Sequence, residues 1–365
     1  MKVRKSPVAR WLLVALVGMV LAGCSQDSLT GLRQEVATPV SGPTESLSQA
    51  APSPTTPDTP DTPDTPDTPG AVAEAATRTP KPGATRPAPT ETPQLALSDG
   101  EEAMLVGAGD IGDCDGDGDE RTAALLDDIE GTVFTLGDNV YDRGTAKEYR
   151  ECYDPSWGRH KARTRPAPGN HDYRTDEAGP YYDYFGDAAG EKGKGYYSYD
   201  LGSWHIVVLN SNCKYVGGCE EDSAQVRWLE EDLADNPARC TLAYWHHPLF
   251  NAGEHGNEKA VRPMWEALYE AGAEVVLSGH DHNYQRFAPQ DAGGKSDPEL
   301  GIREFVVGTG GKDHYNIDKR IPNLEVSNDD TNGVLKLTLR AGDYSWEFIP
   351  AEGEDFRDSG TGSCH

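Results

Sequence analysis

The chain of 365 residues is short of basic side chains, because 33 Lys and Arg stand against 61 Asp and Glu. Residues 1–100 carry −2 of the net charge of −28, so residues 101–365 carry −26. A surface this acidic repels polyanions and anionic membranes at long range, although a bound metal can reverse the sign inside a cleft. The composition therefore argues against nucleic acid as a partner and favours a small substrate.

The N-terminal hydrophobic run, residues 11–21, is too short to cross about 30 Å of hydrocarbon as a helix. Four basic residues precede it, and small residues follow it, as in a secretory signal peptide. The run ends in LAGC, which resembles the bacterial lipobox, so we expect residues 1–23 to be removed and Cys24 to be acylated. An ordinary secretory signal with a chance cysteine is the alternative. We expect an extracytoplasmic protein, attached to the bacterial cell membrane only through lipid on Cys24.

No CxxC spacing occurs among the seven cysteines, which argues against a thiolate metal site. Six cysteines remain after Cys24, and an even number in an oxidising compartment predicts disulfides. Fifteen pairings of six cysteines are possible. The short loop through two glycines favours Cys213–Cys219, and a link that would hold the C-terminus favours Cys240–Cys364. Cys114–Cys152 is then the remaining pair.

Proline is concentrated in one segment, with 14 of the 26 prolines between positions 39 and 93. This segment includes a perfect DTP repeat over residues 58–69, and its composition cannot build a hydrophobic core. Such a density of proline favours extended polyproline II. We therefore predict a disordered stalk over residues 24–100 and a catalytic domain over residues 101–365.

Short apolar runs alternate with helix-like segments from residue 101 onward, which predicts a mixed α/β domain rich in antiparallel sheet. The predicted helices cover residues 120–129, 223–234 and 258–270. The predicted strands cover residues 103–109, 132–136, 196–199, 205–209, 241–245, 274–277, 305–307, 334–339 and 344–349.

Five polar clusters follow these apolar runs: GDIG at 109–112, GDNVY at 137–141, GNHD at 169–172, WHHP at 245–248 and GHDH at 279–282. Loops beyond the carboxyl ends of strands converge on one crevice in open α/β folds. The donors are hard oxygens and imidazoles, which suit first-row transition metals: Asp110, Asp138, Tyr141, Asn170, His246, His280 and His282. Seven ligands exceed one tetrahedral site, whereas two cations about 3.5–4 Å apart need a shared carboxylate. Asp138 is the natural bridge.

Each cluster alone has an ordinary structural explanation, such as a turn-forming Asp or a solvated His. Together they resemble the calcineurin-like metallophosphoesterases over residues 104–349, and within them the purple acid phosphatases. The family pattern is DxG, GDxxY, GNH plus an acid, VxxH and GHxH, and only the fourth departs from it, reading AYWH. The larger superfamily has a His two residues after its first Asp. Gly112 stands there in this chain, and Tyr141 supplies the replacement ligand.

The resemblance implies a four-layer α/β/β/α sandwich with two mixed central sheets. It further implies that Asp110, Tyr141 and His282 hold a first metal, typically Fe(III). It also implies that a second, divalent ion (Fe, Zn or Mn) is held by Asn170, His246 and His280. Asp138 would bridge the two ions.

The resemblance also implies hydrolysis of small phosphomonoesters by a metal-bound hydroxide. His171 and His255 match positions that contact substrate, and His255 would protonate the leaving oxygen. The alternatives are a phosphodiesterase or nucleotidase with the same metals, or a surface lipoprotein that binds metal or phosphate without catalysis. The sequence gives no indication of oligomeric state.

A second acidic motif gives weaker evidence for a metal site. Asp113, Asp115, Asp117 and Gly118 reproduce the first half of an EF-hand calcium loop, but Ala124 stands at position twelve in place of Glu. A complete EF-hand is excluded. A looser calcium site remains as an alternative to a solvated acidic loop.

Overall fold

The computed structural model describes residues 102–317 and 319–365. The predicted signal peptide, Cys24 and the predicted stalk lie outside these residues. In the part of the chain that the structure describes, no helix is both long and apolar enough to cross a membrane.

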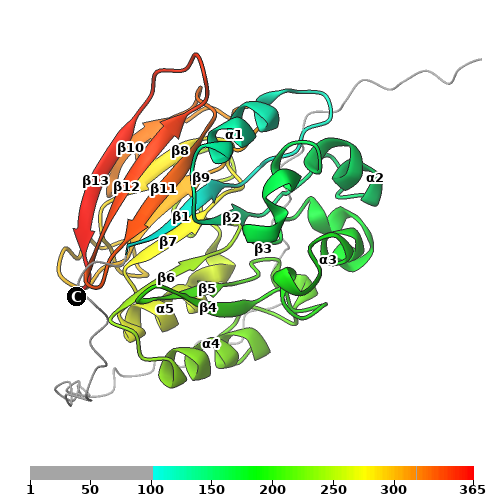
Figure 1. The fold of residues 1–365 in the computed structure, drawn as a ribbon. Coiled ribbons are helices and arrows are strands. Elements are labelled where there is room, and N and C mark those ends of the chain that lie inside the picture. The colour runs from blue at the N-terminus through cyan, green and yellow to red at the C-terminus, as the bar shows by residue number, and fades with distance from the viewer. Residues whose placement is uncertain (1–101, 318) are drawn as a thin grey trace, which may run out of the picture. The chain divides into compact units, whose positions relative to one another are not determined.

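A six-stranded mixed sheet carries the first three expected ligand loops (Figure 1). Its strands, in spatial order, are β13 (Asp358–Ser363), β12 (Asp343–Pro350), β11 (Gly333–Leu339), β1 (Ala103–Ala108), β2 (Thr132–Leu136) and β3 (Thr164–Ala167). β1, β2 and β3 are parallel, whereas β11 runs antiparallel to β1. The three parallel strands therefore end at the same edge of the sheet.

A seven-stranded mixed sheet carries the other two ligand loops. Its strands, in spatial order, are β10 (Leu324–Asn328), β8 (Tyr284–Phe287), β9 (Arg303–Val307), β7 (Val275–Ser278), β6 (Cys240–Tyr244), β5 (Trp204–Val208) and β4 (Tyr197–Leu201). β5, β6, β7 and β9 are parallel. Every residue of β5, β6 and β7 is buried, as expected for strands covered on both faces.

The two sheets pack face to face and are flanked by helices (Figure 1). Phe134 of β2 contacts Tyr244 of β6 across the interior, with ring centroids 5.9 Å apart. The helices are α1 (Gly118–Asp127), α2 (Ala146–Glu148), α3 (Gly179–Phe185), α4 (Ala224–Asp235) and α5 (Arg262–Ala271). α1 packs against β11, while α4 and α5 form a second core with the seven-stranded sheet. The predicted four-layer sandwich is confirmed.

Local sequence explains where two of the amphipathic helices, α4 and α5, begin and end. The Ser223 side chain accepts a hydrogen bond from the Val226 backbone and so caps the start of α4. α5 has Pro263 in its first turn and is followed by Gly272, whose φ of 80° is the left-handed conformation common after helices. Met264, Trp265 and Leu268 then lie on one buried face.

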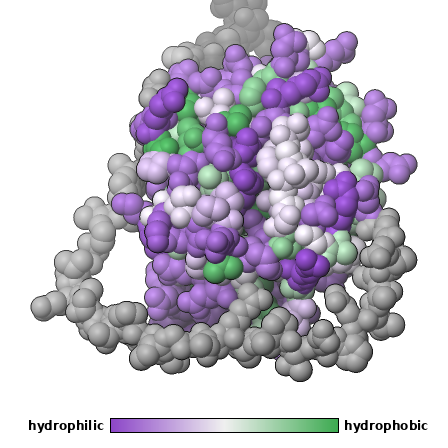
Figure 2. All heavy atoms as spheres, turned by 90° about the vertical axis from the view of Figure 1, so that its left-hand side faces the viewer, coloured by the Kyte–Doolittle hydropathy of each residue, from purple (hydrophilic) through white to green (hydrophobic). Residues whose placement is uncertain are grey.

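The three predicted disulfides are confirmed: Cys114–Cys152, Cys213–Cys219 and Cys240–Cys364. The predicted strands and helices are all present, with shifts of one to four residues at several ends. α2, α3, β3, β8, β10 and β13 were not predicted. The face of the domain seen in Figure 2 is largely hydrophilic or neutral, with hydrophobic residues only in small groups.

Candidate metal centre

All seven expected ligands lie just beyond the carboxyl ends of parallel strands. Asp110 follows β1, Asp138 and Tyr141 follow β2, and Asn170 follows β3. His246 follows β6, while His280 and His282 follow β7. Because the two sheets face each other, the five loops meet at one end of the sandwich.

The Tyr141 hydroxyl organises the first half of the cluster. It lies 2.8 Å from Asp110 Oδ1 and 3.0 Å from His282 Nε2. It also lies 3.1 Å from Asp138 Oδ2. These are the three residues expected around a first metal, together with the expected bridge.

His246 organises the second half. Its Nε2 lies 2.9 Å from Asn170 Oδ1 and 3.2 Å from His280 Nδ1. The same nitrogen lies 3.4 Å from Asp138 Oδ2. One oxygen of Asp138 therefore contacts both halves of the cluster, as a bridging ligand must.

Two imidazoles are held by backbone carbonyls behind them. His246 Nδ1 lies 2.7 Å from the Leu136 oxygen, and His282 Nδ1 lies 2.7 Å from the Asp313 oxygen. A carbonyl only accepts hydrogen bonds, so Nδ1 carries a proton in each ring and Nε2 is the nitrogen that faces the cluster. This arrangement is the usual support for a metal-binding histidine.

Glycines allow the five loops to approach closely. A Cβ at Gly169 would lie 2.1 Å from Asp138 Oδ1, and a Cβ at Gly279 would lie 2.6 Å from Asp110 Oδ2. Any larger residue at either position would displace an expected ligand. Steric contact with the expected ligands therefore explains why glycine is the first residue of GNHD and of GHDH.

Burial and the charges of neighbouring ligands strongly shift the pKa values of the ligands. Burial raises the pKa of Asp110 to about 7, and the Asp138 charge adds to this. Burial also opposes ionisation of Asp138, but the His246 and His171 imidazoles outweigh it and hold that pKa well below its usual range. Burial lowers the pKa of His246, but the Asp138 carboxylate more than offsets this and raises it to about 9.

The donor set fits two cations. Burial and the Asp110 charge raise the pKa of Tyr141 well above its usual value, so the metal-free cluster keeps its phenolic proton. Cations would take the place of these protons, because buried carboxylates need a compensating charge. Two groups of convergent ligands occur within residues 102–317 and 319–365, Asp110–Asp138–His246 and His246–His247–His280, and both belong to this cluster.

His171 and His255 border the cluster, as expected. The His171 ring centroid lies 4.4 Å from that of Tyr141, and its Nδ1 is 2.7 Å from the Asp142 carbonyl oxygen. The His255 ring centroid lies 4.2 Å from that of His280. Its Nδ1 is 3.0 Å from Asp281 Oδ1.

Two acidic residues that support the site were missed by the sequence analysis. Asp281, the central acid of GHDH, is buried and also accepts a hydrogen bond from Asn251. Glu304 of β9 accepts hydrogen bonds from the Leu249 and Phe250 backbones, which ties the loop after WHHP to the sheet. Asp281 could have been suspected from its place between two ligands. An isolated acid in an apolar strand gives no such signal for Glu304.

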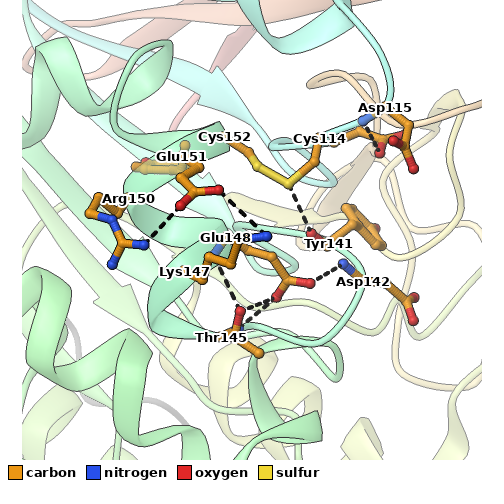
Figure 3. Close-up of a disulfide and its surroundings, with 12 residues drawn as sticks. Cys114, Asp115, Tyr141, Asp142, Thr145, Lys147, Glu148, Arg150, Glu151 and Cys152 are labelled. Carbon is orange, nitrogen blue, oxygen red and sulfur yellow. Dashed lines mark hydrogen bonds and ion pairs between the residues drawn. A yellow bond between two sulfur atoms is a disulfide. The ribbon is translucent and has the colours of Figure 1, made fainter. Parts of the chain in front are cut away.

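The Cys114–Cys152 disulfide braces two ligand loops (Figure 3). Cys114 comes four residues after Asp110, and its sulfur lies 3.9 Å from the Tyr141 carbonyl oxygen. Glu148 accepts hydrogen bonds from the Asp142 and Thr145 backbones, at 3.0 and 2.7 Å. The segment that follows Tyr141 is therefore fixed from two sides.

The calcium alternative stays a prediction, although one acid of this loop and one acid directly after it have other partners. Asp113 pairs with Lys312 at 2.9 Å, and Asp119 accepts a hydrogen bond from the Ser156 hydroxyl at 2.5 Å. These carboxylates already have partners on other segments.

Residues 105–284 match the family model described as calcineurin-like phosphoesterase. The domain belongs to the calcineurin-like phosphoesterases. Among curated relatives, purple acid phosphatase 22 of Arabidopsis thaliana is 35% identical over 122 residues, which is 32% of this chain and 27% of the relative. The chain thus matches about a quarter of that relative's length. The similarity places this phosphoesterase domain in the purple acid phosphatase-like branch.

Solved structures support the same fold for the phosphoesterase domain. A purple acid phosphatase from yellow lupin seeds, Lupinus luteus, has a TM-score of 0.57 at 18% identity, covering 72% of this chain and 53% of that one. GAP50 of Plasmodium has a TM-score of 0.57 at 12% identity, covering 72% of this chain and 89% of that one. At these identities the similarity concerns the fold alone.

Proposed function

We propose that the protein is a binuclear-metal phosphatase that hydrolyses phosphomonoesters. The observation that carries this proposal is the contact of one Asp138 oxygen with both Tyr141 and His246. Asp110, Tyr141 and His282 would hold one cation. Asn170, His246 and His280 would hold the other, with Asp138 shared.

The donor chemistry supports two different metals. A phenolate and carboxylates favour a trivalent ion, so we propose Fe(III) in the half that contains Tyr141. An amide oxygen and two imidazoles suit divalent iron, zinc or manganese in the other half. When bound, two such cations polarise a phosphoryl oxygen and lower the pKa of water.

The two histidines at the border have separate roles in the proposal. His171 Nδ1 is held by the Asp142 carbonyl, so the opposite nitrogen faces the cluster, 3.9 Å from Asp138 Oδ2, where it can bind a phosphate oxygen. Asp281 holds His255 Nδ1, which leaves its other nitrogen to give a proton to the leaving oxygen.

We also propose that the protein is exported and attached to the bacterial membrane through Cys24. The three disulfides support export, because such bonds persist in oxidising compartments. Labelling of wild type, but not of Cys24→Ser, with a radioactive fatty acid would test the attachment.

The function is tested by metal analysis and by hydrolysis of matched aryl esters. We expect two metal equivalents per full-length chain, and turnover of p-nitrophenyl phosphate well above that of bis(p-nitrophenyl) phosphate. Preference for the diester would point to a phosphodiesterase with the same centre. Two metals with no turnover of either ester, under iron, zinc and manganese loading, would favour the non-catalytic binding protein.

A further inference from the structure

An exposed aromatic side chain lies beside the candidate metal centre. Among the described residues, Tyr215 and Leu300 are the large hydrophobic side chains left exposed, at 41% and 49%. Tyr215 lies on the loop after β5, whose carboxyl end is at the same edge of the sheet as the loops that carry His246 and His280. Its exposure needs an explanation, because nothing in its own loop requires an aromatic ring.

The loop of Tyr215 is bonded to two ligand loops. The Ser211 hydroxyl lies 2.7 Å from His247 Nδ1 and accepts from the His247 backbone at 3.0 Å. The Asn212 side chain donates to the Pro168 carbonyl at 3.2 Å, two residues before Asn170. The segment therefore forms part of the rim of the centre.

The same loop is rigid. Cys213 and Cys219 close it with a disulfide, and the Gly218 backbone donates to the Cys213 carbonyl at 2.8 Å. The Tyr215 backbone donates to the Asn212 carbonyl at 2.9 Å. A side chain on such a loop has a fixed direction, which is what a binding surface needs to lower the entropic cost of association.

One face of the Tyr215 ring is covered, while 41% of the residue's surface stays exposed. The ring stacks on Tyr173, with centroids 4.3 Å apart and planes 13° apart. Tyr173 is buried, two residues beyond His171, and its hydroxyl accepts a hydrogen bond from Asn210 at 2.8 Å. The exposed area of Tyr215 therefore belongs largely to the face turned away from Tyr173.

A positive charge accompanies the open face. The Lys214 ammonium lies 5.1 Å from the Tyr215 ring centroid, and no described carboxylate forms an ion pair with it. In a domain with a charge of −26, an ammonium at this place favours an anionic ligand.

We propose that Tyr215 and Lys214 form a leaving-group subsite that accepts phosphate esters with a planar aromatic ring, nucleotides being the biological class. This proposal rests on the proposed phosphatase function. The aromatic ring stacks on the open face of Tyr215, while the reacting phosphate lies at the metal centre. In the reaction with AMP, a water oxygen bonds to phosphorus and the bond to O5′ breaks. O5′ takes a proton, and adenosine and inorganic phosphate are released.

The test compares two substrates that differ only in the base, AMP and ribose 5-phosphate, with the full-length, metal-loaded protein. Stacking is worth roughly 1–3 kcal/mol per base, so Tyr215→Ala should lower the ratio of their kcat/KM values by about tenfold. Tyr215→Phe keeps the ring and should restore the ratio. Lys214→Met should lower kcat/KM for both substrates by a similar factor. Leu300→Ala removes the other exposed hydrophobic side chain and should change neither value.

A binding measurement separates this proposal from the proposed function. Adenosine has no phosphate, and equilibrium dialysis should show about tenfold weaker binding to Tyr215→Ala than to wild type. Equal binding of adenosine to both proteins, or an equal loss of activity toward AMP and ribose 5-phosphate, would overturn the subsite while the phosphatase stands. Absence of all turnover would reject the phosphatase, and adenosine binding would still decide the role of Tyr215.

Discussion

Three of the expected ligands adopt a backbone conformation that side chains other than glycine rarely take. The φ angles of Asp110, Asp138 and His280 are 61°, 47° and 72°. Each such residue costs of order 1–3 kcal/mol and persists only where neighbours fix it. The Asp110 backbone, for example, donates to the Gly137 carbonyl and accepts from Lys312. Strain at three ligands in one cluster indicates that position matters more than local stability here.

Replacing Asp138 tests the centre at the carboxylate that its two halves share. Asp138→Asn keeps the size of the side chain and tolerates the left-handed φ, but it removes the negative charge between the two halves. We expect loss of at least one metal equivalent and a fall in phosphatase activity of more than about 100-fold, the upper end for partners outside the coordination sphere. Metal analysis and p-nitrophenyl phosphate hydrolysis measure both effects. Asp183→Asn, an exposed site on α3, is the control, and full metal loading with normal activity in Asp138→Asn would refute the shared role.

Asp281 provides a second residue-scale prediction, because it holds His255 by Nδ1. A positioned general acid contributes about 10²–10⁴-fold where the leaving group needs a proton. Asp281→Asn should therefore slow hydrolysis of alkyl phosphates by about tenfold or more, and hydrolysis of p-nitrophenyl phosphate much less. The comparison requires equal metal content in both proteins. An equal slowing of both substrates would mean that Asp281 acts on its metal-binding neighbours and not through His255.

Among the elements, β13 shows how the two sheets are joined at their far edge. It belongs to the six-stranded sheet, yet Asp358 bonds to Arg286 Nε at 2.7 Å and to the Tyr284 hydroxyl at 2.8 Å, both on β8 of the other sheet. Trp346 of β12 donates to the same carboxylate at 3.1 Å. One acid therefore connects three strands.

Asp358→Asn should weaken this link in a pH-dependent way. Burial raises the pKa of Asp358, but the bonds from Arg286 and Tyr284 outweigh it and lower the pKa. A lowered pKa means that the carboxylate stabilises the fold above its unfolded pKa, near 4, and loses this effect as the pH falls further. We expect a loss of about 1–2 kcal/mol in the free energy of unfolding at pH 7, and a smaller difference at pH 3. Urea denaturation measures this. Asp343→Asn, an exposed site on β12, should stay within about 0.5 kcal/mol of wild type.

How far the sequence predicted these elements depends on where their stability originates. β2 was predicted residue for residue because TVFTL is an apolar run with high strand propensity. β13 was missed because DSGTGS offers no apolar alternation, and its place depends on pairing with β12 and on Asp358. The positions of the seven expected ligands could be predicted because these residues follow strands, whereas Glu304 acts through contacts from its strand to a loop distant in sequence.

At the scale of the whole molecule, the negative charge of the protein opposes the binding of the proposed anionic substrates. The described domain lies within the part of the chain that carries −26, and the proposed substrates are anions. Long-range attraction by the surface therefore cannot deliver the substrate. Recognition has to come from bound cations and from local charges such as Lys214, which makes metal loading decisive for binding as well as for chemistry.

The disulfides tie this molecule together over very different lengths of chain. Cys240–Cys364 joins the start of β6 to the segment after β13 across 124 residues, whereas Cys213–Cys219 closes a loop of 6. If a crosslink acts by restricting the unfolded chain, its effect grows with the loop, to about 5 kcal/mol for the long one and about 2 kcal/mol for the short one. We therefore expect Cys240→Ser/Cys364→Ser to lower the free energy of unfolding more than Cys213→Ser/Cys219→Ser does. Urea denaturation of the two variants decides this. Equal losses would mean that native packing around the bridges, and not chain entropy, sets their contribution.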